Sequence, residues 1–250
     1  MKLADKKTLV VGASSGIGAE VAKQLAGKGC EVALVARRRE QMEVLAAEID
    51  KIAGRQLAHV YPADVTDYDA APALFETICE DLGGLDMVVY ASGVLHQIAP
   101  NEYSFAKDRQ VIEVNVLGAI AWLNVAAERF EKAKGGAIVG ISSVAADRGR
   151  RGQPVYNASK AALETYLEGL RNRLGRFGVL VTTIKPGFVA TPMLAGVKTP
   201  IPPVPVEDAA AQIILAVEDG ALVRYVSPKW RWIGLAIKMI PSPLMQRMNI

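Results

Sequence analysis

The chain has 250 residues, of which 51% are hydrophobic and 22% are charged, and its formal net charge is +3. This composition predicts a globular protein rather than a disordered one, because the apolar side chains suffice to build a core. The weak positive charge includes no basic stretch interleaved with aromatic residues, so nucleic acid is not an expected partner.

Apolar, strand-like runs alternate with segments of helical periodicity along the whole chain. The expected strands are 8–12, 31–36, 57–62, 86–90, 137–142, 179–184 and 222–226. The expected helices are 16–28, 38–53, 67–82, 104–133, 154–176 and 207–219. This alternation predicts an α/β fold, a doubly wound Rossmann-type parallel sheet of seven strands with helices on both faces. No linker or repeat interrupts it, so we expect one dinucleotide-binding and catalytic domain over residues 1–250.

The first strand runs into a glycine-rich turn and then into a helix. Glycines let the backbone turn tightly and approach a pyrophosphate, whose charge is favoured at a helix N-terminus. The spacing is G-x-x-x-G-x-G rather than the common G-x-G-x-x-G, and an ordinary strand-to-helix loop is the alternative. The candidate cofactor contacts in this turn are Gly12, Ser14, Ser15, Gly16, Ile17 and Gly18.

The second strand ends in three arginines, 37–39, with no acidic residue at its tip. In dinucleotide folds an acidic residue at this place binds the ribose 2′-hydroxyl, whereas an arginine accommodates a 2′-phosphate. Arg37 and Arg38, with hydroxyls from the glycine turn, therefore predict NADP(H) rather than NAD(H). The alternative is that the arginines only solvate the next helix, which is the better interpretation for Arg39.

The segment 1–7 contains no apolar signal region, which favours a cytoplasmic location. The two cysteines, Cys30 and Cys79, suggest no disulfide framework. The two histidines, His59 and His96, lie far apart in the sequence, so no metal site is expected.

Tyr156 and Lys160 lie four residues apart, and Ser143 lies thirteen residues before Tyr156. Positions i and i+4 share one face of a helix. A free tyrosine titrates near pH ~10, and a neighbouring positive charge moves that pKa toward the neutral range. Such a phenol can give a proton to a carbonyl oxygen or take one from an alcohol. In isolation the pair would usually be a solvated surface pair.

Combined with the glycine turn, these residues make the chain resemble the short-chain dehydrogenase/reductases over nearly its whole length. The resemblance implies hydride transfer between a nicotinamide cofactor and a ketone or secondary alcohol. The matching motifs, in the family's order, are Gly12 to Gly18, Asp64-Val65, Ala91-Ser92-Gly93, Asn115, Ser143, Tyr156, Lys160, Pro186-Gly187, Val189 and Thr191. Two departures are Val11, where a threonine is common, and Tyr90-Ala91, which replace two asparagines and leave their strand-stabilising role unfilled.

The resemblance implies four catalytic roles. Tyr156 is the general acid in reduction, Lys160 lowers its pKa and binds the nicotinamide ribose, and Ser143 donates a hydrogen bond to the substrate oxygen. Asn115 holds a water that links Lys160 to solvent, or its side chain simply bonds to backbone. Ser142 is the competing serine.

The resemblance also implies how the cofactor is held beyond the glycine turn. Asp64 and Val65 contact the adenine, and the segment after the sixth strand holds the nicotinamide carboxamide through backbone near Val189 and the side chain of Thr191. A helix cap is the alternative for Thr191. The remaining candidate contacts are Ala91, Gly93, Pro186 and Gly187.

Three further segments bear on the substrate. The arginines at 148, 150 and 151 can clamp an anion, and a solvated loop or a subunit contact is the alternative. The segment 194–206 resembles a substrate lid, or forms a fixed surface loop. The apolar tail, 228–250, is too short to span a bilayer, which needs ~20 apolar residues.

If the tail is helical, Arg231, Gly234 and Lys238 form a polar stripe beside an apolar one. Such a helix can lie peripherally at the inner membrane surface. Burial in a lid or an oligomer contact is the alternative. The apolar stripe consists of Trp230, Ile233, Ile237 and Ile240.

The arginine loop and the tail together suggest a lipid- or phosphate-linked sugar as substrate. Residues 142–160 and the tail resemble the keto-sugar reductase that partners a decaprenylphosphoryl-ribose epimerase oxidase. The alternative enzyme is a 3-oxoacyl or 3-ketosphinganine reductase. A non-catalytic NADP-binding regulator is the alternative of another class, although such a protein would be expected to lose the tyrosine or the lysine. The resemblance further implies a homodimer or homotetramer through the helices near 104–133 and 154–176.

Overall fold

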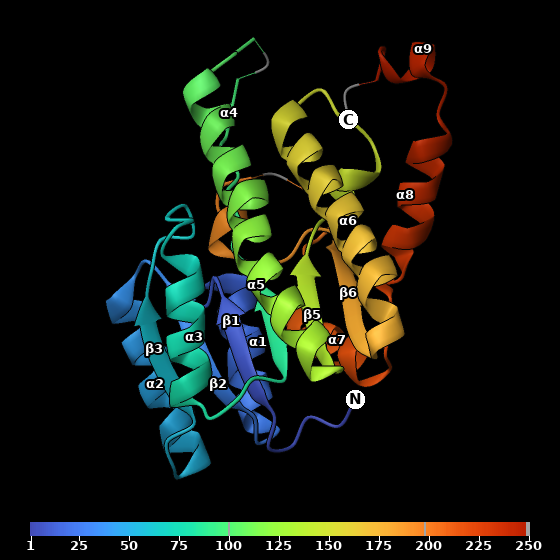
Figure 1. The fold of residues 1–250 in the computed structure, drawn as a ribbon. Helices are drawn as coiled ribbons and strands as arrows, with labels where there is room; N and C mark the ends of the chain where they lie inside the picture. Colours follow the sequence, from blue (N-terminus) through green and yellow to red (C-terminus); the bar gives the residue numbers. More distant parts are fainter. Residues whose placement is uncertain (100, 198, 249–250) are drawn as a thin grey trace.

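The computed structural model describes residues 1–99, 101–197 and 199–248. One sheet of parallel strands has the order β3-β2-β1-β4-β5-β6-β7, and helices cover both of its faces (Figure 1). This confirms the predicted doubly wound α/β fold. The strands are β1 (Lys7–Val11), β2 (Glu31–Ala36), β3 (Ala58–Pro62), β4 (Met87–Tyr90), β5 (Gly136–Ile141), β6 (Val179–Pro186) and β7 (Val223–Val226).

The strands are continuous apolar runs because both faces of the sheet are buried. In β1, Leu9, Val10 and Val11 are all fully buried. Since successive side chains of a strand point to opposite faces, Val10 enters one core cluster while Leu9 and Val11 enter the other. The sheet therefore separates two cores of comparable size.

In the described part of the chain, three helices cover each face. The first core is closed by α1 (Gly16–Gly27), α2 (Arg39–Ala53) and α7 (Val206–Glu218). The second is closed by α3 (Ala71–Asp81), α5 (Gly118–Ala133) and α6 (Pro154–Leu174). Because the chain reverses direction across the sheet between β1 and β4, the carboxyl ends of these strands border a crevice, which is where ligands bind in such sheets.

Two predicted helices differ from the observed ones. The helix predicted to start at 67 begins at Ala71, because the Asp64 carboxylate accepts from the Thr66 amide and the Asp67 carboxylate accepts from the Ala70 amide. These bonds form a turn that competes with the helix. The helix predicted over 104–133 is divided by a π-helical turn.

The π-helical turn Glu113–Leu117 lies between α4 (Phe105–Ile112) and α5. Tyr90 Oη donates a 2.8 Å hydrogen bond to the Val114 carbonyl in this turn. Tyr90 is fully buried, and it ties the end of β4 to the helix. At one of the two positions where the resemblance led us to expect asparagine, a phenol thus links β4 to the π-helical turn.

Among the described residues, one helical segment, Phe105–Ala133, is long and apolar enough to cross a membrane by length and composition alone. Half of its most apolar window is buried inside the fold. Trp122 and Phe130 of this segment belong to the second core. These features are those of a helix that packs on a sheet.

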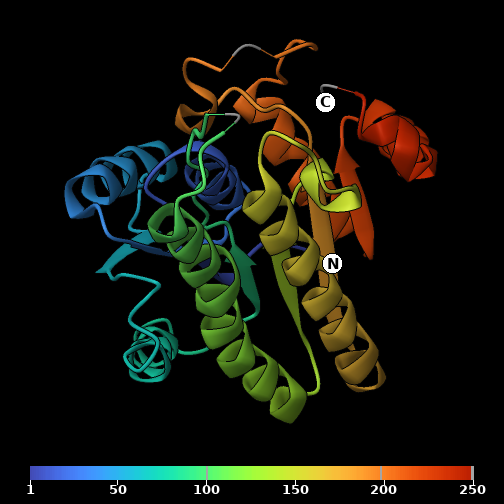
Figure 2. The same ribbon diagram turned by 90° about the horizontal axis from the view of Figure 1, so that it is seen from above.

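The chain ends in two helices, α8 (Lys229–Met239) and α9 (Ser242–Met245). In Figure 2 they lie at the β7 side of the sheet, where α8 contacts the 3₁₀ turn Val144–Asp147 that follows β5. Trp230 is buried and packs edge-on against Phe188, with 5.4 Å between the ring centroids. A Cβ at Gly187 would lie 2.0 Å from Trp230 Nε1, so only glycine admits the indole there.

The two stripes predicted for the tail are only partly correct. Of the predicted apolar stripe, Trp230 is buried and Ile233, Ile237 and Ile240 are half-buried, but Gly234 is buried rather than lying in a polar stripe. The exposed apolar side chains of this part of the chain are Trp232, Leu235, Met239 and Leu244. Positions 249 and 250 of the expected tail and position 198 of the expected loop 194–206 lie outside the described residues.

Candidate active site

A cavity of about 750 Å³ opens at the carboxyl ends of the strands. It collects the predicted cofactor residues and three of the four predicted catalytic residues. Asn115 is fully buried behind its wall. The predicted residues that line the cavity are Gly12, Ser14, Ser15, Gly16, Ile17, Gly18, Arg37, Arg38, Asp64, Val65, Ala91, Gly93, Ser143, Tyr156, Lys160, Pro186, Gly187, Val189 and Thr191.

The glycine turn is shaped by close backbone contacts. Gly12 has φ +94°, and a Cβ there would lie 2.5 Å from the Ser92 amide nitrogen. A Cβ at Gly18 would lie 2.2 Å from the Gly12 carbonyl oxygen. Strand β1, the start of α1 and the end of β4 therefore meet without side chains between them. The N-terminus of α1 is left facing the cavity, as the phosphates of a dinucleotide require.

Arg38 lies over this turn. Its Nη2 donates to Ser14 Oγ at 2.8 Å and to Ser15 Oγ at 2.6 Å. The guanidinium and two hydroxyls thus form one donor cluster at the end of β2, where a ribose 2′-phosphate is expected. A nucleotide that carries this extra phosphate fits the residues present.

Arg37 differs from Arg38 because its Nη1 lies 3.6 Å from Asp64 Oδ2. Burial alone would raise the pKa of Asp64, but hydrogen bonds from Thr66 and the charge of Arg37 bring that pKa below its ordinary value. Asp64 is therefore a carboxylate at neutral pH and offsets the charge of Arg37. Of the two predicted arginines, Arg38 is the one free of a carboxylate partner among the described residues.

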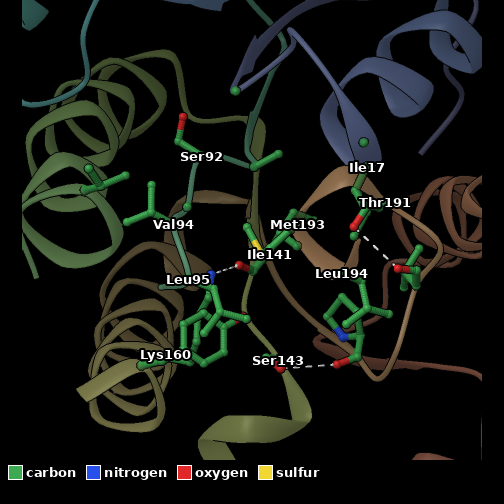
Figure 3. A pocket seen from close by; sticks show the side chains of 18 of the residues that line it. Ile17, Ser92, Val94, Leu95, Ile141, Ser143, Lys160, Thr191, Met193 and Leu194 are labelled. Atoms are coloured by element: carbon green, nitrogen blue, oxygen red, sulfur yellow. Dashed lines mark hydrogen bonds between the residues drawn. The ribbon is translucent and has the colours of Figure 1, made fainter. Parts of the chain in front are cut away.

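Tyr156 and Lys160 lie on the same side of α6, as their spacing predicted. Lys160 Nζ is 5.8 Å from the centre of the Tyr156 ring and donates to the Ile141 carbonyl at 2.9 Å. Ser143 Oγ contacts the Pro186 carbonyl at 3.4 Å and accepts from the Ala145 amide (Figure 3). The phenol, the ammonium and the hydroxyl therefore meet at one end of the cavity.

The pKa of the phenol does not follow the prediction. Burial raises the pKa of Tyr156 above its ordinary value, and the Ser143 hydroxyl and the Arg150 guanidinium oppose that rise only in part. Burial also lowers the pKa of Lys160 to about 8, against the attraction of Glu164. The i,i+4 spacing correctly predicted that the two groups lie close together. Removal from water nevertheless raises the pKa of Tyr156 more than its neighbours lower it. The phenol is protonated at neutral pH, which is the form that donates.

Asn115 is held by protein groups on both sides of its amide. Its Oδ1 accepts from the Val94 amide at 2.8 Å, and its Nδ2 donates to the Val94 carbonyl and to Ser159 Oγ, each at 3.1 Å. The side chain thus makes the backbone bonds that the sequence offered as the alternative. A Cβ at Gly93 would lie 3.4 Å from both Asn115 Oδ1 and Lys160 Nζ, so the amide and the ammonium flank the same glycine.

Ser142, the competing serine, belongs to a polar cluster behind the site. Its Oγ donates to Glu164 Oε1 at 2.9 Å. Lys185 is 5% exposed, and its Nζ contacts Glu164 Oε2 at 2.8 Å and Asp147 Oδ1 at 2.6 Å. Sequence reasoning missed this cluster. The signal available was the i+4 spacing from Lys160 to Glu164, which continues the spacing from Tyr156 to Lys160.

The three arginines of the predicted clamp separate in the structure. Arg148 donates to the carbonyls of Lys238 and Ile240, so it fastens the end of α8. Arg151 is exposed on the surface, and Arg150 alone lines the cavity. Arg148 and Arg151 are therefore wrong as clamp residues, because the fold turns their positions away from the site.

Beside the polar groups the cavity has an apolar wall. Figure 3 shows Leu95, Met193 and Leu194 around the space next to Ser143. Met193 and Leu194 come from the segment after β6, and a parallel bridge between Val189 and Val204 closes the base of that segment. Of the predicted loop 194–206, Leu194 and Val197 thus line the cavity.

The comparisons with known proteins agree with this arrangement. The profile of the short chain dehydrogenase family matches residues 6–201. An uncharacterized oxidoreductase of Myxococcus xanthus is 38% identical over 197 residues, which is 79% of this chain and 77% of that protein. An uncharacterized oxidoreductase of Staphylococcus haemolyticus is 30% identical and covers 77% of this chain and 81% of its own.

Solved structures show the same similarity. A short chain dehydrogenase of Burkholderia cenocepacia in complex with NADP is 29% identical, with a TM-score of 0.80 over 90% of this chain and 96% of that one. A short-chain dehydrogenase of Sphingobium yanoikuyae in complex with NADPH is 25% identical, with a TM-score of 0.82 over 97% and 96%. The protein belongs to the short-chain dehydrogenase family, and is thus an oxidoreductase.

Proposed function

We propose that this protein is an NADP(H)-dependent oxidoreductase that interconverts a ketone and a secondary alcohol, with Tyr156 as the general acid or base. The observation that carries the proposal is the meeting of Tyr156, Lys160 and Ser143 at one end of a cavity whose other end is the glycine turn under Arg38. The relatives solved with NADP and NADPH support the choice of cofactor.

The cofactor supplies the hydride when it is bound. Arg38, with the hydroxyls of Ser14 and Ser15, holds the 2′-phosphate, and the N-terminus of α1 holds the pyrophosphate. Asp64 and Val65 flank the adenine, and Thr191 and the backbone near Val189 hold the carboxamide.

The protein's own groups manage the charge on the substrate oxygen. The Tyr156 hydroxyl gives that oxygen a proton, and the Ser143 hydroxyl donates a hydrogen bond to it. Lys160 holds the nicotinamide ribose and attracts the phenolate that forms. Asn115 positions the cavity wall beside Lys160 through its bonds to Val94 and Ser159. Burial keeps the phenol protonated, which is the form that the general acid of ketone reduction requires.

The test is Tyr156→Phe, followed by NADPH absorbance with a panel of ketones. We expect a loss of roughly 10²–10⁴-fold in turnover, with NADPH affinity measured by fluorescence changed far less. Tyr166→Phe is the matched control, because Tyr166 lies on the same helix and its hydroxyl bonds to Asn124 rather than facing the cavity. Retention of most turnover in Tyr156→Phe would contradict the proposed chemistry.

We further propose a lipid- or phosphate-linked keto-sugar as the substrate, as in the decaprenylphosphoryl keto-sugar reductases. Arg150 on the cavity wall and the apolar residues beside it support this choice. A 3-oxoacyl thioester or a 3-ketosphinganine is the second candidate, favoured by the same apolar wall. NADPH consumption with a lipid-linked keto-sugar and with a 3-oxoacyl thioester, compared side by side, separates the two.

We also propose a cytoplasmic enzyme that touches the inner membrane surface through its tail. The support is that Trp232, Leu235 and Met239 are exposed on α8, which also exposes Arg231 and Lys238. Aromatic and basic residues are favoured at the interface of an anionic bilayer. Co-sedimentation with anionic liposomes at low salt tests this, with Trp232→Ser/Leu235→Ser as the variant. Absence of wild-type binding would remove the proposal.

Self-association is proposed as a homodimer or homotetramer. Three large apolar side chains are exposed at or near α4 and the π-helical turn, namely Tyr103, Phe105 and Leu117, and their burial would favour a contact along α4 and α5. Sedimentation velocity of the wild type and of Phe105→Ser tests this contact. A wild-type monomer at micromolar concentration would contradict it.

A further inference from the structure

Charged groups are unevenly distributed around the cavity. Its described lining residues include four cationic side chains and only one carboxylate, that of Asp64. Asp64 pairs with Arg37 near the cofactor end. The substrate end therefore has no described carboxylate in its wall. An anionic ligand meets no repulsion there.

Three of the four cations already have partners or roles. Arg37 pairs with Asp64, Arg38 bonds to the serines of the glycine turn, and Lys160 donates to the Ile141 carbonyl. Arg150 makes no hydrogen bond or ion pair with any residue in the described ranges. It is the cation for which the fold provides no partner.

The carboxylate closest to Arg150 in sequence is committed elsewhere. Asp147 Oδ1 lies 2.6 Å from Lys185 Nζ, and both oxygens lie 3.4 Å from Tyr225 Oη. A Cβ at Gly234 would lie 2.6 Å from Asp147 Oδ2, so this carboxylate also presses against α8. Asp147 attracts Arg150 only at longer range.

The loop that carries Arg150 is anchored on its N-terminal side. Arg148 donates to the carbonyls of Lys238 and Ile240, and Asn157 Nδ2 donates to the carbonyls of Ala145 and Arg148. Asn157 is the residue after Tyr156, so the loop and the phenol share one support. A loop whose backbone is anchored beside Arg150 loses less entropy when the arginine binds a ligand.

We infer that Arg150 binds an anionic group of the substrate, a phosphate or a carboxylate, close to the carbonyl that Tyr156 protonates. This inference rests on the proposed function and narrows its substrate class. The half-buried guanidinium is costly without a partner, and a phosphate or carboxylate of the substrate satisfies it with charge-assisted hydrogen bonds. Burial lowers the pKa of Arg150, and the charge of Arg150 opposes the rise in the pKa of Tyr156, in agreement with their place in the lining of the same cavity.

The apolar wall adds a second requirement on the substrate. The same cavity is also lined by the apolar residues Leu95, Ile98, Phe188, Met193 and Leu194. The substrate class is therefore a ketone with one anionic group near the carbonyl and an apolar remainder.

The experiment compares matched ketones that differ in charge. Dihydroxyacetone phosphate and dihydroxyacetone form the phosphate pair, and acetoacetate and methyl acetoacetate form the carboxylate pair. NADPH oxidation gives kcat/KM for the wild type, Arg150→Gln, Arg150→Lys and the exposed control Arg151→Gln. We expect the wild type to favour the anionic ketone in one of the two pairs. That pair shows whether the group bound by Arg150 is a phosphate or a carboxylate. In Arg150→Gln that preference falls roughly tenfold to a hundredfold, mainly through KM.

The two variants at position 150 and the control separate the outcomes. Arg150→Lys retains part of the preference, and Arg151→Gln retains all of it. If Arg150→Gln lowers the efficiency of charged and neutral ketones equally, the arginine acts on the phenol alone and the inference is overturned. The same holds if the wild type shows no preference for charge.

A binding readout keeps this inference distinct from the proposed function. With NADP⁺ saturating, so that Arg38 is occupied, calorimetric titration with inorganic phosphate and with acetoacetate measures the anion site directly. Binding that is lost in Arg150→Gln and kept in Arg151→Gln supports the inference even if no ketone is reduced. No difference between the wild type and Arg150→Gln overturns it even if reduction is observed.

Discussion

Replacing Lys160 by methionine should stabilise the folded protein while it abolishes carbonyl reduction. Lys160 is 4% exposed, and burial lowers its pKa from 10.5 to about 8. That difference corresponds to roughly 3 kcal/mol of unfavourable free energy for the charged form in the folded state. Loss of the hydrogen bond to the Ile141 carbonyl offsets about 1 kcal/mol of the gain. At pH ~7 we therefore expect Lys160→Met to raise the free energy of unfolding by roughly 2 kcal/mol.

The sign of the pH dependence follows from the direction of the pKa change. Since the pKa of Lys160 is lower in the folded state, the unfolded chain binds more protons between about pH 8 and 10.5. Wild-type stability therefore gains from this group as the pH rises through that window, and Lys160→Met lacks the gain. The advantage of the variant should shrink by roughly 2 kcal/mol between pH ~7 and pH ~9.5.

Urea unfolding followed by tryptophan fluorescence measures both free energies over a pH series. All other titratable groups are common to the two chains, so their contributions cancel in the difference. NADPH oxidation by the same preparations reports the expected loss of activity. A difference in unfolding free energy that stays constant from pH ~7 to pH ~9.5 would show that the ammonium is not desolvated, and would refute the reasoning.

Three further substitutions, one of them with a matched control on the same helix, test other parts of the protein. Arg38→Ala should lower the ratio of NADPH to NADH efficiency roughly tenfold to a hundredfold, and an unchanged ratio in steady-state kinetics would contradict the role of the serine-bound guanidinium. Gly18→Ala should cost about 1–3 kcal/mol in urea unfolding and weaken NADPH binding, because its Cβ would lie 2.2 Å from the Gly12 carbonyl oxygen. Gly27→Ala on the same helix, with nothing within 4 Å of its Cβ, should be neutral or slightly stabilising. Tyr90→Phe should cost about 1–3 kcal/mol by leaving the carbonyl in the π-helical turn unpaired, and equal unfolding curves would refute that bond.

The fold could be predicted from the sequence because its determinants are local. Buried parallel strands need continuous apolar runs, and each run ends in glycine or polar residues. The start of α3 was missed because the bonds of Asp64 and Asp67 depend on side-chain geometry that no periodicity records. The π-helical turn was missed because it depends on Tyr90, a residue more than twenty positions away.

Most residues of the site could be predicted from the sequence, but the direction of the pKa shift of Tyr156 could not. The predicted cofactor residues follow the strands of the sheet. They lie in one cavity because the carboxyl ends of these strands converge in this topology. The sequence predicted a lowered pKa for Tyr156, and this was wrong because the spacing of two residues gives their proximity but not their burial. Arg148 and Arg150 were indistinguishable in the sequence, and only the docking of α8 separates them.

Helix α8 of the tail affects the candidate active site through a series of contacts that leads from Gly234 to Lys160. The buried Gly234 lets α8 approach the Asp147 carboxylate, which binds Lys185 Nζ at 2.6 Å. The same Nζ binds Glu164 at 2.8 Å, and the charge of Glu164 raises the pKa of Lys160 against the effect of burial. The ionic state of the candidate catalytic lysine thus depends on packing that begins in the last helices. A side chain larger than hydrogen at position 234 would displace Asp147 and should therefore be detected as a change in the pH dependence of reduction.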